Sequence, residues 1–184
     1  HVRSRRQRQM CIRDRRGTRR RLLQANAAAH KFYQEQLETP EAQDARDMLL
    51  QRGFDEALIK EFTCGYAPAG WDTVTRHLQK QGFTFEELEA AGISKMGSRG
   101  TPIDRFHRRL IWPISIPSGE VVGFGARKLY DDDKLGKYMN TPETMLYKKS
   151  KVLFGLDKAK KYIAESHQCV VVELSLIHIS EPTR

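Results

Sequence analysis

The sequence predicts a mixed α+β fold, with a helical N-terminal half followed by a small, mostly antiparallel β-rich part. Residues 22–92 carry apolar side chains at helical spacing, divided by capping residues and glycines. After Gly100 the period changes, and two short β-rich runs are joined by a Pro-Ser-Gly turn. A helix over residues 157–166 and a buried strand over residues 169–173 complete the predicted order. The 184 residues suffice for one core and part of another unit.

Capping residues divide the helical half into separate helices. An Ala-rich helix is expected over residues 22–37. The expected N-caps of the following helices are Thr39 before Pro40, Asp55, Asp72, and Thr84, the last forming a capping box with Glu87. Gly53, Gly82 and Gly92 stand where helices are expected to stop, because glycine adopts the left-handed conformation at little cost.

The β-rich half, residues 99–156, is expected to hold two strands, over residues 110–114 and 120–125. Residues 131–150 predict a long ordered loop, of the kind that carries function. Asp157 is the expected cap of the last helix. Residues 169–173 read as a buried strand that ends in the carboxylate of Glu173.

Charge is distributed unevenly along the chain, and the net charge of +9 hides this. Residues 1–21 hold ten arginines and one aspartate, so the remaining residues are neutral as a whole. Within that remainder, residues 99–161 hold 14 basic and seven acidic groups. This basic segment is the expected site for a polyanion.

The two ends of the chain are set apart from the rest. Residues 1–21 show no apolar periodicity and are expected to form a disordered basic arm or a non-native tail. Residues 174–184, like the first residues, resemble translated adaptor sequence and are also expected to be non-native. Domain boundaries are therefore expected near residues 21 and 166, with residues 22–166 as one domain and residues 167–173 as the start of another.

Several classes of protein are disfavoured by composition. Cys11, Cys64 and Cys169 are far apart, so neither a zinc site nor a disulfide framework is expected. No apolar run approaches the roughly 20 residues that span a bilayer. No signal peptide is recognisable. We expect a cytoplasmic protein without a membrane partner.

Four motifs occur in a fixed order. They are RFHRRLIWPI at 105–114, GFGAR at 123–127, KYMNTPET at 137–144 and VVE at 171–173. In this order they resemble the signatures of bacterial replicative DNA primases, and the first is closest to actinobacterial members. The resemblance covers residues 22–173. It implies the N-terminal subdomain of the catalytic core plus the first strand of an α/β TOPRIM domain.

The resemblance also implies the activity and partners of the parent protein. These would be DNA-dependent synthesis of short RNA primers on single-stranded DNA from ribonucleoside triphosphates. The replicative helicase would bind a C-terminal domain, and zinc an N-terminal domain; neither domain is matched here. The family's catalytic centre binds Mg²⁺ or Mn²⁺, and Glu173 matches one of its acidic residues. Leu174 and Ser175 depart from the pattern and no DxD segment follows, so this chain is expected to be inactive alone.

Basic positions associated with template and nucleotide contacts in the family are matched by Arg52, Arg109, Arg127, Lys137 and Lys149. Arginine offers a planar fork to phosphate oxygens, and lysine a mobile point charge. Because Arg109 and Arg127 flank strands, rigid backbone is expected to aim both. Asn140 is a further candidate for contact with the nucleotide.

For the other side chains in the motifs, the sequence predicts a role less specifically. Tyr138 is the candidate for stacking on bases, whereas Phe106 and Trp112 are expected in the core. His107 stands where the family commonly has arginine. The run Asp131–Asp133 is expected to be a solvated acidic turn rather than a metal site.

Two other functions remain open. The chain can be a non-catalytic module that binds single-stranded DNA, because a basic surface is present while the metal centre is incomplete. Another TOPRIM enzyme, such as a topoisomerase or nuclease, is disfavoured because GFGAR and KYMNTPET resemble the primase-specific subdomain.

Overall fold

A computed structural model describes residues 5–171 of the chain as one helix-flanked antiparallel sheet with a small second sheet. The elements in chain order are α1 (Arg5–Leu37), η1 (Pro40–Ala42), α2 (Gln43–Gln51), α3 (Glu56–Glu61), β1 (Gly65–Ala67), α4 (Thr73–Lys80), α5 (Phe85–Ala90), β2 (Ser94–Met96), β3 (Pro102–Asp104), β4 (Arg109–Ser115), β5 (Val121–Lys128), β6 (Tyr138–Asn140), η2 (Lys149–Lys151) and α6 (Leu156–Ser166). The mixed α+β class predicted from the sequence is confirmed.

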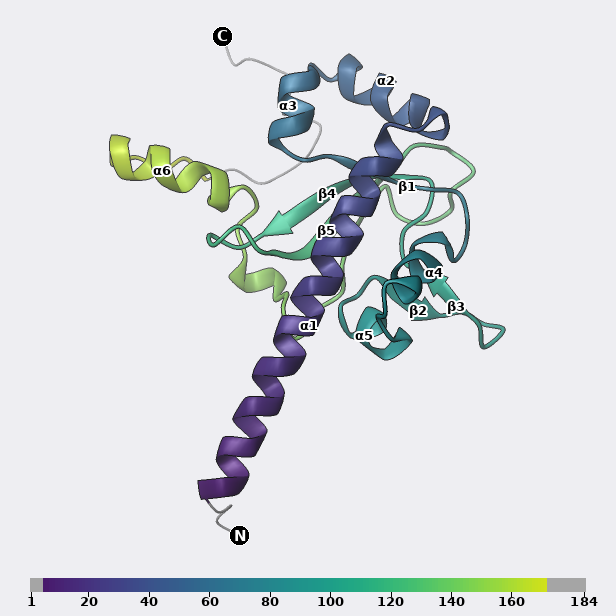
Figure 1. Cartoon of the computed structure of the whole chain (residues 1–184). Helices are drawn as coiled ribbons and strands as arrows, with labels where there is room; N and C mark the ends of the chain where they lie inside the picture. The colour runs from purple at the N-terminus through teal and green to yellow at the C-terminus, as the bar shows by residue number, and fades with distance from the viewer. Residues whose placement is uncertain (1–4, 172–184) are drawn as a thin grey trace.

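The main sheet has the strand order β1-β4-β5-β6, with every pair antiparallel. The long helix α1 runs across one face of this sheet and extends beyond it at its N-terminal end (Figure 1). The rings of Tyr33 on α1 and Phe124 on β5 meet edge to face, with centroids 5.3 Å apart. Helix and sheet approach closely at Gly65, where an added Cβ would lie 2.7 Å from the Cβ of Tyr33.

Two hydrophobic clusters cover the two faces of the sheet. One lies between α1 and the strands and includes Tyr33, Ile111 and Phe124. The other lies on the opposite face, where Leu110 and Trp112 pack with side chains from α2 and α3. Six consecutive residues of β4 are therefore buried, because both faces of this central strand are covered. Phe106 is fully buried and Trp112 is 4% exposed, which confirms their predicted place in the core.

Helix α4 is capped from a distance. Asp72 occupies its N-cap position, as predicted, but makes no capping hydrogen bond and pairs with Arg76 instead. The backbone N–H groups of Val74 and Thr75 donate to the carboxylate of Asp104 at 2.9 and 2.8 Å. Burial raises the pKa of Asp104 to about 6 against these donors. The cap thus ties α4 to the end of β3.

The structure differs from the sequence prediction at the start of the chain. Residues 1–21 were expected to be a disordered basic arm or a non-native tail, but α1 begins at Arg5 and runs without a break through the predicted 22–37 helix. Extending an existing helix avoids the cost of nucleation, and arginine and glutamine are good helix formers. The expectation of disorder is therefore wrong for residues 5–21.

Three later expectations also need correction. Gly155, with φ of 77°, is the N-cap of α6, so Asp157 lies inside its first turn instead of capping it. The predicted loop over 131–150 contains strand β6. Residues 169–171 form no strand, and Val170 and Val171 are 87% and 72% exposed, since no neighbouring strand pairs with them among the described residues. Glu173 and the tail 174–184 lie outside the described residues.

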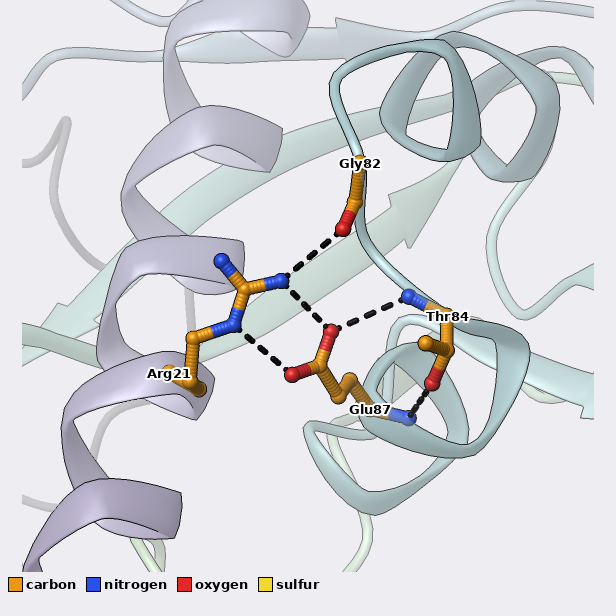
Figure 2. A network of polar contacts seen from close by, with 4 residues as sticks. All are labelled: Arg21, Gly82, Thr84 and Glu87. Atoms are coloured by element: carbon orange, nitrogen blue, oxygen red, sulfur yellow. Dashed lines mark hydrogen bonds and ion pairs between the residues drawn. The ribbon is translucent and has the colours of Figure 1, made fainter.

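A polar network anchors α1 to α5. Arg21 donates from Nε and Nη2 to the two carboxylate oxygens of Glu87, at 2.7 and 2.8 Å, and from Nη2 to the carbonyl of Gly82 (Figure 2). Thr84 and Glu87 form the predicted capping box, which is confirmed. Glu87 therefore fixes its own helix and the long helix together. No helix within residues 5–171 is both long and apolar enough to cross a bilayer.

This network predicts a stability change at acidic pH. The hydrogen bond from Arg21 holds the pKa of Glu87 at about 2, below its ordinary 4.5. A depressed carboxyl pKa contributes stability that is present above pH 4.5 and is lost as the pH falls through about 2. The difference in melting temperature between the wild type and Glu87→Gln should therefore shrink between pH 5 and pH 2. A difference that stays constant over this range would contradict the role of the Glu87 charge.

Candidate nucleic-acid interface

A pocket opens on the face of the sheet away from α1. Its volume is about 370 Å³, and its walls come from β4, β5, β6 and the segment around η2. The lining residues are Trp112, Ile114, Gly125, Ala126, Tyr138, Asn140, Tyr147, Lys149, Val152 and Phe154. Two predicted binding residues, Asn140 and Lys149, thus meet in one pocket with the predicted stacking residue Tyr138. Aromatic walls with an amide and an ammonium group suit a base that carries phosphates.

The glycines of GFGAR shape this pocket rather than forming a phosphate loop. Gly125 pairs with Asn140 across β5 and β6, and an added Cβ at Gly125 would lie 3.3 Å from Asn140 Oδ1. At Gly123 an added Cβ would lie 3.1 Å from the Cβ of Thr141. The hydroxyl of Thr141 accepts a hydrogen bond from the Phe124 N–H at 2.8 Å. The small residues therefore let β6 and the chain after it lie close to β5.

Arg127 lies beside the pocket and is almost buried. It pairs with Tyr138 across the two strands, and its guanidinium carbon is 6.0 Å from the centre of the Tyr138 ring. The side chain is 7% exposed, its Nη1 contacts the sulfur of Met48, and its Nε has no hydrogen-bond partner. The positive charge sits behind Tyr138 and favours an electron-rich ring there.

Arg109 is not on this face. The register places Leu110 opposite Arg127, and successive residues of a strand point to opposite faces, so Arg109 projects to the other side. It is 1% exposed, forms an ion pair with Asp133, and donates from Nη1 to the carbonyl of Gly136 at 2.9 Å. Arg109 and Arg127, both predicted to contact template or nucleotide, therefore project from opposite faces of the sheet, and Arg109 holds the loop between β5 and β6.

The other predicted residues lie outside the pocket lining. Lys137 is exposed, with its Nζ 5.8 Å from the centre of the Tyr138 ring, so it borders the pocket on the β6 side. Arg52 is the half-buried C-cap of α2. Glu173 cannot be placed, because it lies outside the described residues.

The acidic run after β5 is engaged in ion pairs. Asp132 pairs with Arg108 at 2.8 Å, Asp133 pairs with the buried Arg109, and Asp131 lies 3.9 Å from Lys128. Asp131 and Asp132 are exposed and fit the expected solvated turn, whereas Asp133 is 15% exposed. In the part of the chain that the structure describes, no group of three or more histidine, cysteine, aspartate or glutamate side chains is placed to hold a metal ion.

One aromatic side chain was missed by the sequence reasoning. Trp71, which follows Gly70, is 63% exposed and meets the ring of His107 edge to face, with centroids 3.8 Å apart. The N–H of Asp104 donates to the Trp71 carbonyl, at 2.6 Å, and that of Arg108 to the Pro68 carbonyl, at 3.3 Å. These bonds hold the two segments together. In the sequence it is a tryptophan in a break between helices, to which no role was assigned.

The surroundings of this ring pair are basic. Burial lowers the pKa of His107, and the positive charges of Arg109, Lys95 and Arg108 lower it further, whereas Asp133 raises it. The imidazole is therefore neutral at pH 7. An exposed indole beside a basic surface is the combination that binds single-stranded nucleic acid.

Comparisons with known proteins agree with this geometry. The family model described as "DNA primase catalytic core, N-terminal domain" matches residues 32–160. A DNA primase of Mycolicibacterium smegmatis is 63% identical over 159 residues, which are 86% of this chain and 25% of that protein. A DNA primase of Streptomyces coelicolor is 54% identical over the same coverage. The chain therefore spans about a quarter of the length of these curated relatives.

Two solved structures are similar to this chain. The RNA polymerase domain of Mycobacterium tuberculosis primase DnaG, in complex with a double-stranded DNA oligomer with a 6-nucleotide overhang, has a TM-score of 0.82 and 59% identity. The match covers 86% of this chain and 50% of that one. The DnaG primase catalytic domain bound to ssDNA has a TM-score of 0.73 and 36% identity, covering 79% of this chain and 46% of that one.

Proposed function

The chain belongs to the DNA primase family, as the N-terminal domain of the catalytic core, and from this premise we propose that the full-length protein synthesises short RNA primers on single-stranded DNA. This membership confirms the resemblance indicated by the four sequence motifs. The observation that carries the proposal is the pocket in which Tyr138, Asn140 and Lys149 meet. Tyr138 and Asn140 come from the KYMNTPET motif, and Lys149 follows that motif.

In this proposal the pocket holds a ribonucleotide or a template nucleotide. Tyr138 stacks on the base, with the charge of Arg127 behind its ring. Asn140 offers both a donor and an acceptor to polar edges of the nucleotide. Lys149, at the start of η2, contributes its ammonium group to the phosphates. We propose Arg52, at the C-cap of α2, and Lys137, beside the Tyr138 ring, as further phosphate contacts.

A second surface supports single-stranded template binding. Trp71 presents a large exposed face that is held by His107 and by two backbone hydrogen bonds. Because every base has a π-face, such a residue binds a single strand without reading its sequence. Two related structures contain DNA, which is in keeping with this role.

The chemical step is assigned to parts beyond the described residues. We propose that Mg²⁺ or Mn²⁺ serves the full-length enzyme and that Glu173 is one of its ligands. The described residues do not by themselves form such a site, so their contribution is to bind and orient the template and the nucleotide. The helicase contact, the zinc-binding domain and a cytoplasmic location with the replicating DNA belong to the same proposal for the whole protein.

Replacing Lys149 by alanine in the full-length protein is expected to lower kcat/KM for primer synthesis by about 10- to 100-fold, which is the usual cost of a lost charged hydrogen bond. Lys151→Ala is the matched control, because Lys151 lies in the same turn but does not line the pocket. The measurement is primer synthesis on a single-stranded template with ribonucleotides and divalent metal. Equal activity of the two variants would remove Lys149 from the site.

The alternative function is a non-catalytic module that binds single-stranded DNA. It is favoured by Trp71 and the basic surface, neither of which requires a metal centre. The same assay separates the two functions. A full-length protein that binds single-stranded DNA but makes no primers under any divalent metal would establish the alternative.

A further inference from the structure

We propose that Arg108 binds a backbone phosphate of single-stranded DNA and that Asp132 occupies Arg108 in the DNA-free protein as an internal competitor. The proposal rests on the proposed function, since it assumes that this chain binds the template. It concerns a residue that lies in the first motif, at 105–114, but is not among the predicted contact residues. It also gives a role to the acidic run Asp131–Asp133, which the pocket does not use.

Arg108 is placed to receive a phosphate. Its guanidinium lies over the ring of Tyr130, with the guanidinium carbon 4.2 Å from the ring centre, so its orientation is fixed. Nη1 forms the ion pair with Asp132 Oδ2 at 2.8 Å, and the side chain is 40% exposed. A guanidinium held flat on an aromatic ring and partly open to solvent presents its N–H edge to an incoming anion.

The backbone at Arg108 is strained in a way that sets its direction. Its φ of 51° lies in the left-handed region, which residues other than glycine seldom adopt. The conformation is held by the hydrogen bond from the Arg108 N–H to the Pro68 carbonyl. The neighbouring residue His107 is the one that contacts Trp71. The turn therefore places Arg108 next in sequence to the residue that contacts the exposed Trp71.

The three aspartates of the acidic run do different things. Asp133 neutralises the buried Arg109 and belongs to the fold. Asp131 is fully exposed and lies 3.9 Å from Lys128. Asp132 is 64% exposed, and its hydrogen bond from Arg108 lowers its pKa, so it remains a carboxylate at neutral pH. Asp132 is therefore the carboxylate of this run that lies on a partly exposed arginine.

Carboxylate and phosphate compete for the same edge of a guanidinium. Both accept two parallel N–H bonds, so a strand cannot use the edge that Asp132 occupies. Exposed ion pairs contribute little to stability, and the Asp132 pair is open to solvent on both sides, so it yields to a polyanion that releases counterions on binding. The pair lowers the affinity for DNA without abolishing binding.

The test compares Asp132→Asn with Asp131→Asn in the complete 184-residue chain. Both changes remove one negative charge from adjacent positions, so general electrostatics affects them alike. Binding of a radiolabelled oligodeoxythymidylate is measured by filter binding over a range of salt concentrations. Asp132→Asn is expected to tighten binding about 3- to 10-fold, as for an exposed ion pair and its local repulsion, and Asp131→Asn by no more than about twofold. The N-terminal arginines are the same in every variant and cancel in these ratios.

Arg108 variants complete a double-mutant cycle. Arg108→Ala is expected to weaken binding and to reduce the salt slope by about one unit, as for one lost phosphate contact. In the Arg108→Ala background, Asp132→Asn should raise the affinity for DNA no more than Asp131→Asn does. Arg108→Lys serves as the second variant should the alanine variant fail to fold, and it is expected to lie between wild type and alanine, since it keeps the charge but loses the fork.

Several outcomes would overturn the proposal. Equal gains in affinity for DNA from Asp131→Asn and Asp132→Asn would mean that the effect comes from net charge alone. Weaker DNA binding by Asp132→Asn would show that the ion pair holds the loop in the conformation that binds DNA, and does not compete with it. A gain from Asp132→Asn that persists without Arg108 would place the phosphate elsewhere. Binding by the wild type with no difference among variants overturns this inference alone, whereas no binding by the wild type overturns the proposed template-binding role as well.

Discussion

Replacing Asp133 by alanine is expected to lower the free energy of unfolding by about 3–5 kcal/mol, the usual cost of breaking a buried ion pair from one side. Arg109 is 1% exposed and Asp133 is 15% exposed, so the guanidinium left behind would have neither a counterion nor access to water. The carbonyl of Gly136 would remain as an acceptor for Nη1 only. Chemical denaturation followed by circular dichroism gives the free energy directly.

Asp131→Ala is the matched control for this prediction. Asp131 is two positions away in the same acidic run but fully exposed, and its partner Lys128 is 3.9 Å away. Its replacement should change stability by less than about 1 kcal/mol, as for most exposed pairs. If the two alanine variants lost equal stability, Asp133 would not be the charge that stabilises buried Arg109.

Gly65→Ala is expected to destabilise the fold by about 3 kcal/mol, at the upper end of the range for overpacking a core. The added Cβ would lie 2.7 Å from the Cβ of Tyr33 and 2.8 Å from its carbonyl carbon. The obstacle is the backbone of α1, which cannot turn aside as a flexible side chain would. Helix and sheet would have to separate where Tyr33 meets Phe124.

Gly17→Ala tests the opposite case. Gly17 lies within the same helix α1, and an added Cβ would meet no atom within 4 Å. Alanine there should stabilise the helix by up to about 1 kcal/mol, because glycine is the poorer helix former. Both variants are measured by the same denaturation series. A Gly65→Ala protein as stable as the wild type would show that α1 and β1 are less closely packed than the structure indicates.

Local signals in the sequence were sufficient for much of the fold. The caps at Asp55 and Thr84 are confirmed, because each side chain accepts a hydrogen bond from the backbone N–H three residues on. These caps depend on neighbours in the chain, so the sequence alone specifies them. The cap of α4 could not be predicted, because its carboxylate comes from Asp104, about 30 residues away. Strand β1 was missed since three residues carry too little periodicity.

The candidate site was likewise predicted only in part from the sequence. Asn140 and Lys149 were predicted from motifs and do share a pocket, although nine residues separate them. Arg109 and Arg127 were expected to flank strands. They lie within β4 and β5, and the alternation of side chains along these strands, which was not foreseen, sends them to opposite faces. The burial of Arg109 depends on Asp133 in a later loop. Such a pairing has no local signature.

The different settings of the two tryptophans make the chain its own optical probe. Trp112 is 4% exposed and lines the pocket, whereas Trp71 is 63% exposed and lies against His107. A buried indole emits at shorter wavelength than one in water, so the two tryptophans have different emission maxima. A nucleotide in the pocket and a strand stacked on Trp71 would quench different parts of that spectrum. Occupancy of the two surfaces can thus be followed separately in one unlabelled sample.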